Sequence, residues 1–272
     1  MSKPLPDKDF HGLVIPVRSF SGAHAVRVVH GCAQEISEHM HDWPCITVQV
    51  LGGCTESWDG ASARLEGPSA VFHPARHFHA DRVDEGGLET VSLQFDPGWL
   101  RQEHPELRRS RCWTGGRVAE AARALAARWV SGEEEEEPAL AQATSHFLAL
   151  AAADVPAARP EWLPSVMHAL SAEAPPSTAA MADRLNLHPA WLARAYRSAV
   201  GEGIGDTLRR KRVEQAARLL RTSELPTAMV AQEAGFCDQS HMNRSFRALL
   251  GRTPCSIREE RHLLEEPGQA RR

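Results

Sequence analysis

The sequence predicts an α+β protein of two domains, a β-rich N-terminal half and an all-helical C-terminal half. Three observations support this fold class. Short apolar runs of β character fill the first hundred residues, Ala- and Leu-rich segments follow, and one motif repeats at an offset of 50 residues near the C-terminus. We expect domains at residues 1–157 and 158–272, and a chain of 272 residues is long enough for two hydrophobic cores.

Short strands are expected over residues 11–100. The runs at 45–51 and 90–95 are examples, and turn residues separate such runs at Gly52-Gly53, Asp59-Gly60, Gly67-Pro68 and Gly86-Gly87. Many short strands at even spacing are typical of a β-sandwich or a small barrel.

Residues 101–153 are expected to be mainly helical, because the segments 117–130 and 139–153 are rich in Ala and Leu and lack internal Gly and Pro. The acidic run 133–138 between them favours an exposed loop. Residues 155–160, with two prolines, favour a linker between the domains.

A repeat marks the C-terminal half. Leu192–Arg197 and Met242–Arg247 both read large apolar, any, Arg, any, aromatic, Arg, and Gly201 maps onto Gly251 at the same offset. Helical periodicity alone does not produce such agreement. A helix at 204–222 is expected to join the two copies.

Each copy has the order of residues expected of a helix-turn-helix unit. Ala182 and Ala231 allow close packing, and four residues later Asn186 and Gly235 tolerate the positive φ of a sharp turn. Asp238 is a good N-cap for the second helix of copy two, whereas copy one has the poorer cap His188 followed by Pro189.

The polar faces of the two second helices are candidate DNA-binding surfaces, since their side chains suit base edges or phosphates in a major groove. The candidates are Ala190, Arg194, Arg197, Gln239, Ser240, His241, Arg244 and Arg247. An all-helical packing domain with solvated arginines is the alternative. The basic run Arg209–Arg212 either contacts phosphates or forms a solvated face.

Charge and composition bear on the class of protein. Residues 1–159 hold 15 Lys and Arg against 22 Asp and Glu, a net −7, while residues 160–262 hold 14 against 11, a net +3. This asymmetry weakly favours nucleic-acid binding by the C-terminal half. The sequence has no 20-residue apolar run, no C-x-x-C pair, no P-loop and no Rossmann fingerprint. We therefore expect a cytoplasmic protein without membrane contact, and not an enzyme.

Residues 230–247, continued by Gly251-Arg252-Thr253-Pro254, resemble the signature of the AraC/XylS family of transcription regulators. The departures are His241-Met242 in place of an aromatic pair, Ile204-Gly205 where the first unit usually has Pro, and Ser256-Ile257-Arg258, which lacks the common Tyr. The resemblance implies a homodimer that binds double-stranded DNA, a small-molecule effector and RNA polymerase. It leaves open whether the protein is an activator or a repressor.

Residues 31–96 resemble the two cupin motifs, and this resemblance implies a cupin-like β-barrel over about residues 11–100, in a domain that binds the effector and dimerises. His39-Met40-His41 matches the first, with Cys45 at the place of its Glu, and His79 matches the histidine of the second. Histidines at i and i+2 of one strand share a face, so His79 on a neighbouring strand would complete a three-histidine wall, with Cys45 as a fourth ligand. Such donors suit Zn²⁺, Fe, Co or Ni.

Other interpretations of this cluster stay open. His39, His41, Cys45 and His79 are equally the hydrogen-bonding groups of a metal-free effector pocket, Cys45 is a small buried apolar residue, and His73 and His77 lie at the surface or at strand ends. Three functions compete: an effector-sensing regulator, a metal- or thiol-sensing regulator, and a metal-dependent cupin enzyme fused to a DNA-binding module.

Overall fold

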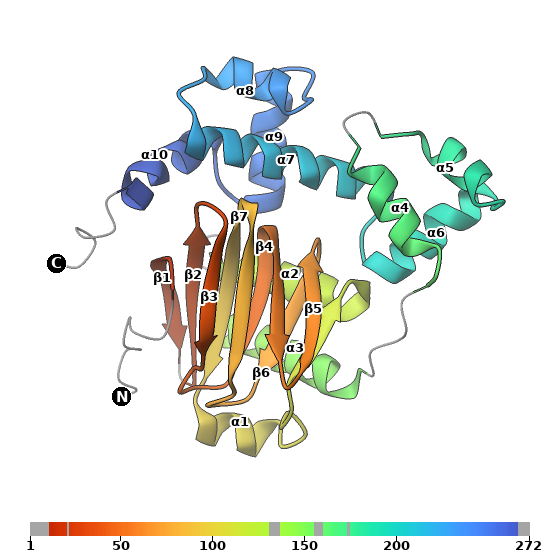
Figure 1. The fold of residues 1–272 in the computed structure, drawn as a ribbon. Helices are drawn as coiled ribbons and strands as arrows, with labels where there is room; N and C mark the ends of the chain where they lie inside the picture. The colour runs from red at the N-terminus through yellow and green to blue at the C-terminus, as the bar shows by residue number, and fades with distance from the viewer. Residues whose placement is uncertain (1–10, 21, 131–136, 155–159, 173–174, 266–272) are drawn as a thin grey trace.

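The computed structural model describes residues 11–20, 22–130, 137–154, 160–172 and 175–265 (Figure 1). Its N-terminal part is rich in β-structure and its C-terminal part is helical, which confirms the predicted mixture of α and β and its order along the chain. In these ranges no helix has both the length and the apolar content that a membrane span requires.

The described strands form one antiparallel sheet in the order β1-β2-β7-β4-β6-β8, with β3 paired to β7 and β5 paired to β4. Because β1 and β8 are the two ends of this order, the hydrogen bonds between the described strands do not close the sheet into a barrel. The strands are β1 (Leu13–Phe20), β2 (Ala23–His30), β3 (Gln34–His39), β4 (Cys45–Trp58), β5 (Ala61–Glu66), β6 (Ser69–His73), β7 (His79–Phe95) and β8 (Arg111–Thr114).

Strands β4 and β7 are longer than expected because they continue through their glycine pairs. Gly52 and Gly87 adopt φ of 78° and 75°, which L side chains rarely adopt. A Cβ on Gly52 would lie 2.0 Å from the carbonyl oxygen of Gly87, so the two chains approach closely there. The predicted breaks at these pairs are therefore wrong as strand ends, whereas Asp59-Gly60 and Gly67-Pro68 do separate strands.

The described helices of the N-terminal part are α1 (Pro97–Glu103), α2 (Gly116–Val130) and α3 (Glu137–Ala153). Helices α2 and α3 form one core with the outer face of the sheet, where Phe72, Phe95 and Trp129 are fully buried. The region expected to be mainly helical also contains β8, which pairs with β6.

Two predicted connections fall mainly outside the described residues. Of the acidic run 133–138, only Glu137 and Pro138 are described, and they begin α3 instead of forming a loop. Of the expected linker, residues 155–159 lie outside the described ranges.

The C-terminal helices follow the repeat. They are α4 (Leu163–Leu170), α5 (Thr178–Arg184), α6 (Pro189–Val200), α7 (Ile204–Thr222), α8 (Thr227–Glu233), α9 (Gln239–Leu250) and α10 (Pro254–Glu265). The joining helix thus has its predicted bounds.

The local geometry of the repeat also agrees with the sequence. Asn186 and Gly235 have φ of 53° and 77° in the turns before α6 and α9. The N-cap side chains of His188 and Asp238 accept hydrogen bonds from backbone N–H groups of α6 and α9. Gly201 and Gly251 end the two helices in the left-handed conformation, as glycine C-caps commonly do.

Each half of the repeat has its own core. Leu192, Tyr196 and Val200 of α6 pack with α4 and α5. At the equivalent positions Met242, Phe246 and Leu250 of α9 pack with α7, α8 and α10. Since Ile204 lies in the first core and Val213 and Leu220 lie in the second, α7 belongs to both.

The C-terminal helices rest on one end of the sheet. Figure 1 shows α7 above the ends of β4 and β7, on the side opposite to α1. Leu51, beside the Gly52 bend, is part of the core formed by α7 to α10. The helical part is therefore in contact with the strands that bend there.

Candidate nucleic-acid interface and histidine pocket

The predicted DNA-binding side chains lie on the outer faces of α6 and α9. Seven of the eight candidates are exposed: Ala190, Arg194, Arg197, Gln239, Ser240, Arg244 and Arg247. The eighth, His241, is half-buried, with its ring centroid 5.3 Å from that of Phe236. Because Arg194 and Arg244 occupy the same place in the repeat, both helices present an exposed guanidinium at equivalent positions.

The basic run of α7 is only in part the solvated face considered from the sequence, because Arg209 and Arg212 are exposed whereas Arg210 is buried. Arg210 is only 4% exposed, and its guanidinium lies 3.0 Å from Glu202 and 2.6 Å from Glu214. Its neighbour Arg209 pairs with Asp206 at 3.2 Å, and Lys211 donates to Ser171 at 2.8 Å. Arg210 is therefore an internal residue, whereas Arg209 and Arg212 remain at the surface of α7.

The structure brings the three predicted histidines together. The ring centroids of His39 and His79 are 4.2 Å apart, those of His41 and His79 are 5.2 Å apart, and those of His39 and His41 are 5.3 Å apart. His39 and His79 face each other across β3 and β7. The reasoning for His41 was wrong in one respect, because β3 ends at His39 and His41 lies in the following turn.

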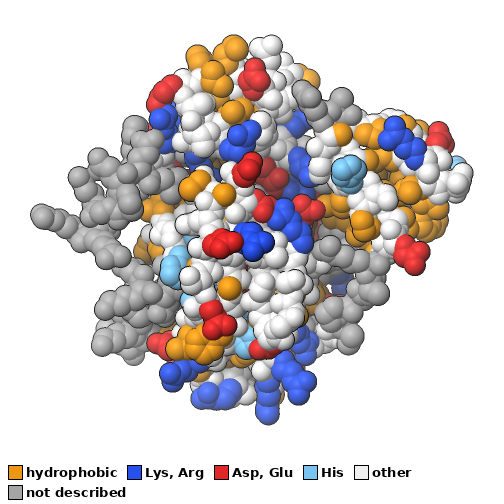
Figure 2. All heavy atoms as spheres, in the orientation of Figure 1, with side chains coloured by type: hydrophobic (Ala, Val, Ile, Leu, Met, Phe, Trp, Pro, Cys, Tyr) orange, Lys and Arg blue, Asp and Glu red, His pale blue; other side chains and the backbone are white. Residues whose placement is uncertain are grey.

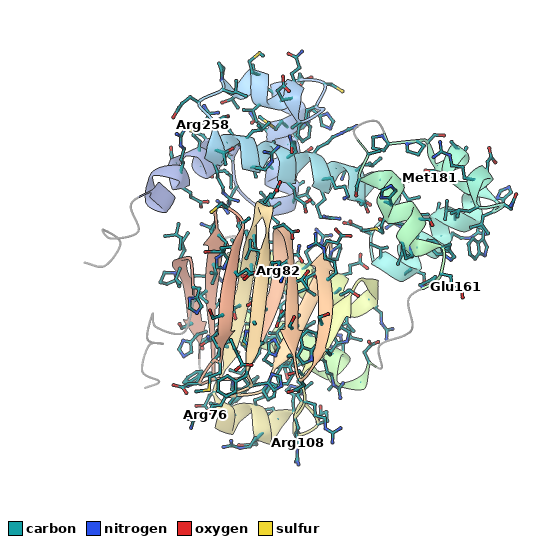
Figure 3. All side chains as sticks on the ribbon, in the orientation of Figure 1. Arg76, Arg82, Arg108, Glu161, Met181 and Arg258 are labelled. Carbon is teal, nitrogen blue, oxygen red and sulfur yellow. The ribbon has the colours of Figure 1, made fainter. Side chains whose placement is uncertain are left out.

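These histidines line a cavity of about 70 Å³. Its wall comes from both halves of β4 and of β7, together with β2, β3, β5 and β6, so it lies inside the bent sheet. Figure 3 shows Arg76, whose N–H donates to the carbonyl oxygen of His41 at 2.7 Å, at the end of the sheet away from the C-terminal helices. The histidine cluster is therefore at that distant end.

Cys45 does not join the cavity wall. It is fully buried in β4, and burial, followed by the charge of Glu56, raises the pKa of its thiol to about 12. A thiol in this environment stays protonated at neutral pH and is a poor metal ligand. Cys54, farther along the same strand, lines the cavity instead.

Sequence reasoning missed the residues beside the predicted triad. Glu56 lines the cavity, its carboxylate contacts Nε2 of His73, and the ring of His73 stacks on that of His79 at 4.3 Å. Asp81, two residues after His79, also lines the cavity. Glu56 was missed because β4 was expected to end before Gly52, and His73 was assigned to a surface or strand-end position.

Burial keeps these groups neutral. It raises the pKa of Glu56 to about 8, and, with a contribution from Glu56, raises that of Asp81 to about 8. Burial also lowers the pKa of His73 to about 3 and, with neighbouring histidines, that of His79 to about 2. The two imidazoles are therefore uncharged at neutral pH.

An ion cluster joins the sheet to the C-terminal helices at the opposite end. Arg27 of β2 and Glu89 of β7 meet Arg221 of α7, Arg252, which precedes α10, and Glu260 of α10. Glu89 lies 3.1 Å from Arg27 and 2.6 Å from both Arg221 and Arg252, while Glu260 lies 2.6 Å from Arg27. Figure 2 shows acidic and basic side chains mixed on the face where these helices meet the sheet.

The position of Glu89 relates this cluster to the cavity. Its neighbours Leu88 and Thr90 line the cavity, while its own side chain points away from it, as strand alternation requires. Burial alone would raise the pKa of Glu89, but the guanidiniums of Arg252, Arg221 and Arg27 lower it to about 2. The carboxylate is thus ionised at neutral pH.

Comparison with known proteins places the C-terminal helices in a known family. Residues 181–260 match the family described as "Helix-turn-helix domain". The chain is 36% identical over 86 residues to the HTH-type transcriptional regulator GlxA of Rhizobium meliloti (strain 1021), which is 32% of this chain and 26% of that protein. It is 35% identical over 68 residues to the regulatory protein SoxS of Escherichia coli (strain K12), which is 25% of this chain and 64% of that protein.

Among solved structures, the chain is similar to ToxT from Vibrio cholerae, with a TM-score of 0.39 and 11% identity. That match covers 89% of this chain and 99% of ToxT. The similarity in sequence thus spans about a quarter of GlxA and less than two thirds of SoxS.

Proposed function

Since its C-terminal part carries the helix-turn-helix domain of AraC-type regulators, we propose that this chain is a sequence-specific DNA-binding regulator of transcription. The observation that carries the proposal is the repeated geometry of α5–α6 and α8–α9. Each pair has a tight turn at a residue with positive φ, a capped second helix and an exposed arginine at the same position. In this proposal, α6 and α9 would enter successive major-groove segments of double-stranded DNA.

The isolated fragment 161–262 is expected to bind DNA, because it contains α6, α9 and the helix that joins them. Its affinity should fall steeply as salt rises, since phosphate contacts release counterions. It should bind less tightly than the full chain if the N-terminal part forms a homodimer and doubles the contacts. Gel-shift titration at several salt concentrations measures both effects, and a folded fragment that binds no DNA even at low salt would contradict the proposal.

The proposal includes a sensing domain at residues 1–157 and a DNA-binding domain at 158–272. The cavity that His39, His41 and His79 border would hold a small-molecule effector, and it is enclosed by the sheet and lined by polar and apolar groups. Strand β7 would pass the effector's influence to α7 and α10, since Leu88 and Thr90 line the cavity on either side of Glu89. RNA polymerase would be the partner of the DNA-bound homodimer.

Replacing two cavity histidines is expected to abolish the response to an effector and to leave DNA binding intact. Metabolites that shift the melting temperature of the full chain would be found by screening, then tested for their effect on operator affinity. In His41→Ala/His79→Ala these metabolites should change neither quantity, because the altered side chains border the cavity. DNA binding should persist because the cluster lies beside Arg76, at the end of the sheet away from the C-terminal helices (Figure 3). His146→Ala, exposed on α3, is the matched control. An unaltered response in the double variant would exclude this cavity as the effector site.

A further inference from the structure

We propose that Glu56, His73 and His79 form a binding site for a divalent transition-metal ion in the floor of the histidine pocket. The site goes beyond the proposed regulation of transcription and does not depend on it. One potential ligand atom from each of these three side chains lies within 4.8 Å of the other two. His79 also belongs to a second group of this kind, with His39 and His41.

Burial favours the group that contains Glu56. Glu56, His73 and His79 are 4%, 2% and 5% exposed, so water competes little for their donor atoms. His39, by contrast, is half-buried. The group with Glu56 also contains a carboxylate, which neutralises part of the charge of a divalent ion, whereas the group of three histidines does not.

The two imidazoles are already oriented for an ion. Nδ1 of His73 lies 3.2 Å from the hydroxyl of Ser110, and Nδ1 of His79 lies 3.3 Å from the carbonyl oxygen of His77. Partners of this type fix the ring and its tautomer in protein metal sites. Nε2 of each ring then remains for coordination, and Nε2 of His73 is the atom that contacts Glu56.

The electrostatics of the pocket lack a compensating cation. No Lys or Arg is among the described residues that line the cavity, although two carboxylates, Glu56 and Asp81, are present. A buried carboxylate is costly unless a positive charge or hydrogen bonds compensate it. A divalent ion between Glu56 and the two histidines would supply that charge and would displace the proton of the hydrogen bond between Glu56 and His73.

The donor set identifies the class of ion. Two neutral imidazoles and one carboxylate suit Zn²⁺, Co²⁺ or Ni²⁺, and the remaining coordination position would face the cavity. The proposed site differs from the set expected from the cupin motif. Glu56, from the far end of the same strand, supplies the carboxylate that the motif places at Cys45.

Metal titration of the full chain tests this site. Protein freed of metal by a chelator would be titrated with Co²⁺, followed by its visible absorption, and Zn²⁺ would then be used in competition. We expect one ion per chain, a higher melting temperature and release of protons on binding. Glu56→Gln and His73→Gln should each weaken binding about 100-fold or more, since even partners outside the coordination sphere contribute 10–100-fold.

Two further variants and a folding check accompany this titration. His146→Gln controls for surface histidines and should bind like the parent chain. His39→Gln/His41→Gln should still bind the ion. Circular dichroism and melting curves recorded without metal identify which variants are folded. If only one of Glu56→Gln and His73→Gln folds, its affinity for the ion alone tests the site.

The proposal is overturned if the parent chain binds no ion, or if folded Glu56→Gln or His73→Gln binds as tightly as the parent. It is also overturned if only the His39/His41 double variant loses the ion. DNA binding of the same samples is measured separately, so a failure of this site is distinguishable from a failure of the regulatory proposal.

Discussion

Glu89→Ala is expected to lower the free energy of unfolding by about 3–5 kcal/mol, the usual effect of removing one partner from a buried ion pair. The variant leaves the guanidiniums of Arg27, Arg221 and Arg252 gathered at the end of the sheet, and among the described residues only the carboxylate of Glu260 then pairs with all three. These side chains are 9%, 5% and 14% exposed, so solvent screens their repulsion poorly. We therefore expect removal of the Glu89 carboxylate to weaken the contacts of α7 and α10 with β2 and β7.

Urea unfolding of the parent chain and the variant measures this effect. The matched control is Glu35→Ala, since Glu35 pairs with Arg82 at 3.1 Å but both side chains are more than 70% exposed. An exposed pair of this kind contributes about 0–1 kcal/mol. Equal small losses in the two variants would show that the cluster does not hold the helices to the sheet.

The same cluster predicts a direction for acid sensitivity. The pKa of Glu89 is lowered to about 2 in the folded protein, so its contribution is fully present above the pKa of an unfolded glutamate. The contribution declines as the pH falls from that value towards about 2. The difference in stability between the parent chain and Glu89→Gln should therefore shrink over this interval.

Arg194→Ala/Arg244→Ala is expected to show the largest loss of DNA affinity. Each arginine should contribute about 1–3 kcal/mol if it contacts a base, and less, with a clear salt dependence, if it contacts phosphate. The two side chains lie on different helices with separate cores, so their effects should add.

Fluorescence anisotropy with labelled operator DNA measures this loss. Arg101→Ala is the control, because it removes one exposed positive charge from α1, at the end of the sheet opposite to the C-terminal helices. Unchanged DNA affinity in the folded double variant would contradict a role of α6 and α9 in DNA binding.

The helical half could be predicted closely because its signals are local. The caps at His188 and Asp238, and the turns at Asn186 and Gly235, depend on residues within a few positions of each other. The repeat added an internal check, since each unit predicts the other.

The sheet and its pocket were harder to predict because their contacts join distant positions. Glu56 and His73 meet only because β4 continues past Gly52 and lies beside β6. Arg210 shows the same limit, since nothing in the basic run indicates that Glu202 and Glu214 bury one of its members. The ion cluster joins residues from positions 27 to 260, and no local pattern marks such a set.

Helix α7 has a consequence for the DNA itself. With 19 residues it is about 28 Å long, and its two ends are anchored in different cores. A straight helix fixed at both ends sets the distance and the rotation between α6 and α9. In the proposed complex, the two DNA segments that α6 and α9 would contact must then lie at one spacing and in one helical phase. An operator with added base pairs between those segments would present the second one on the wrong side of the duplex.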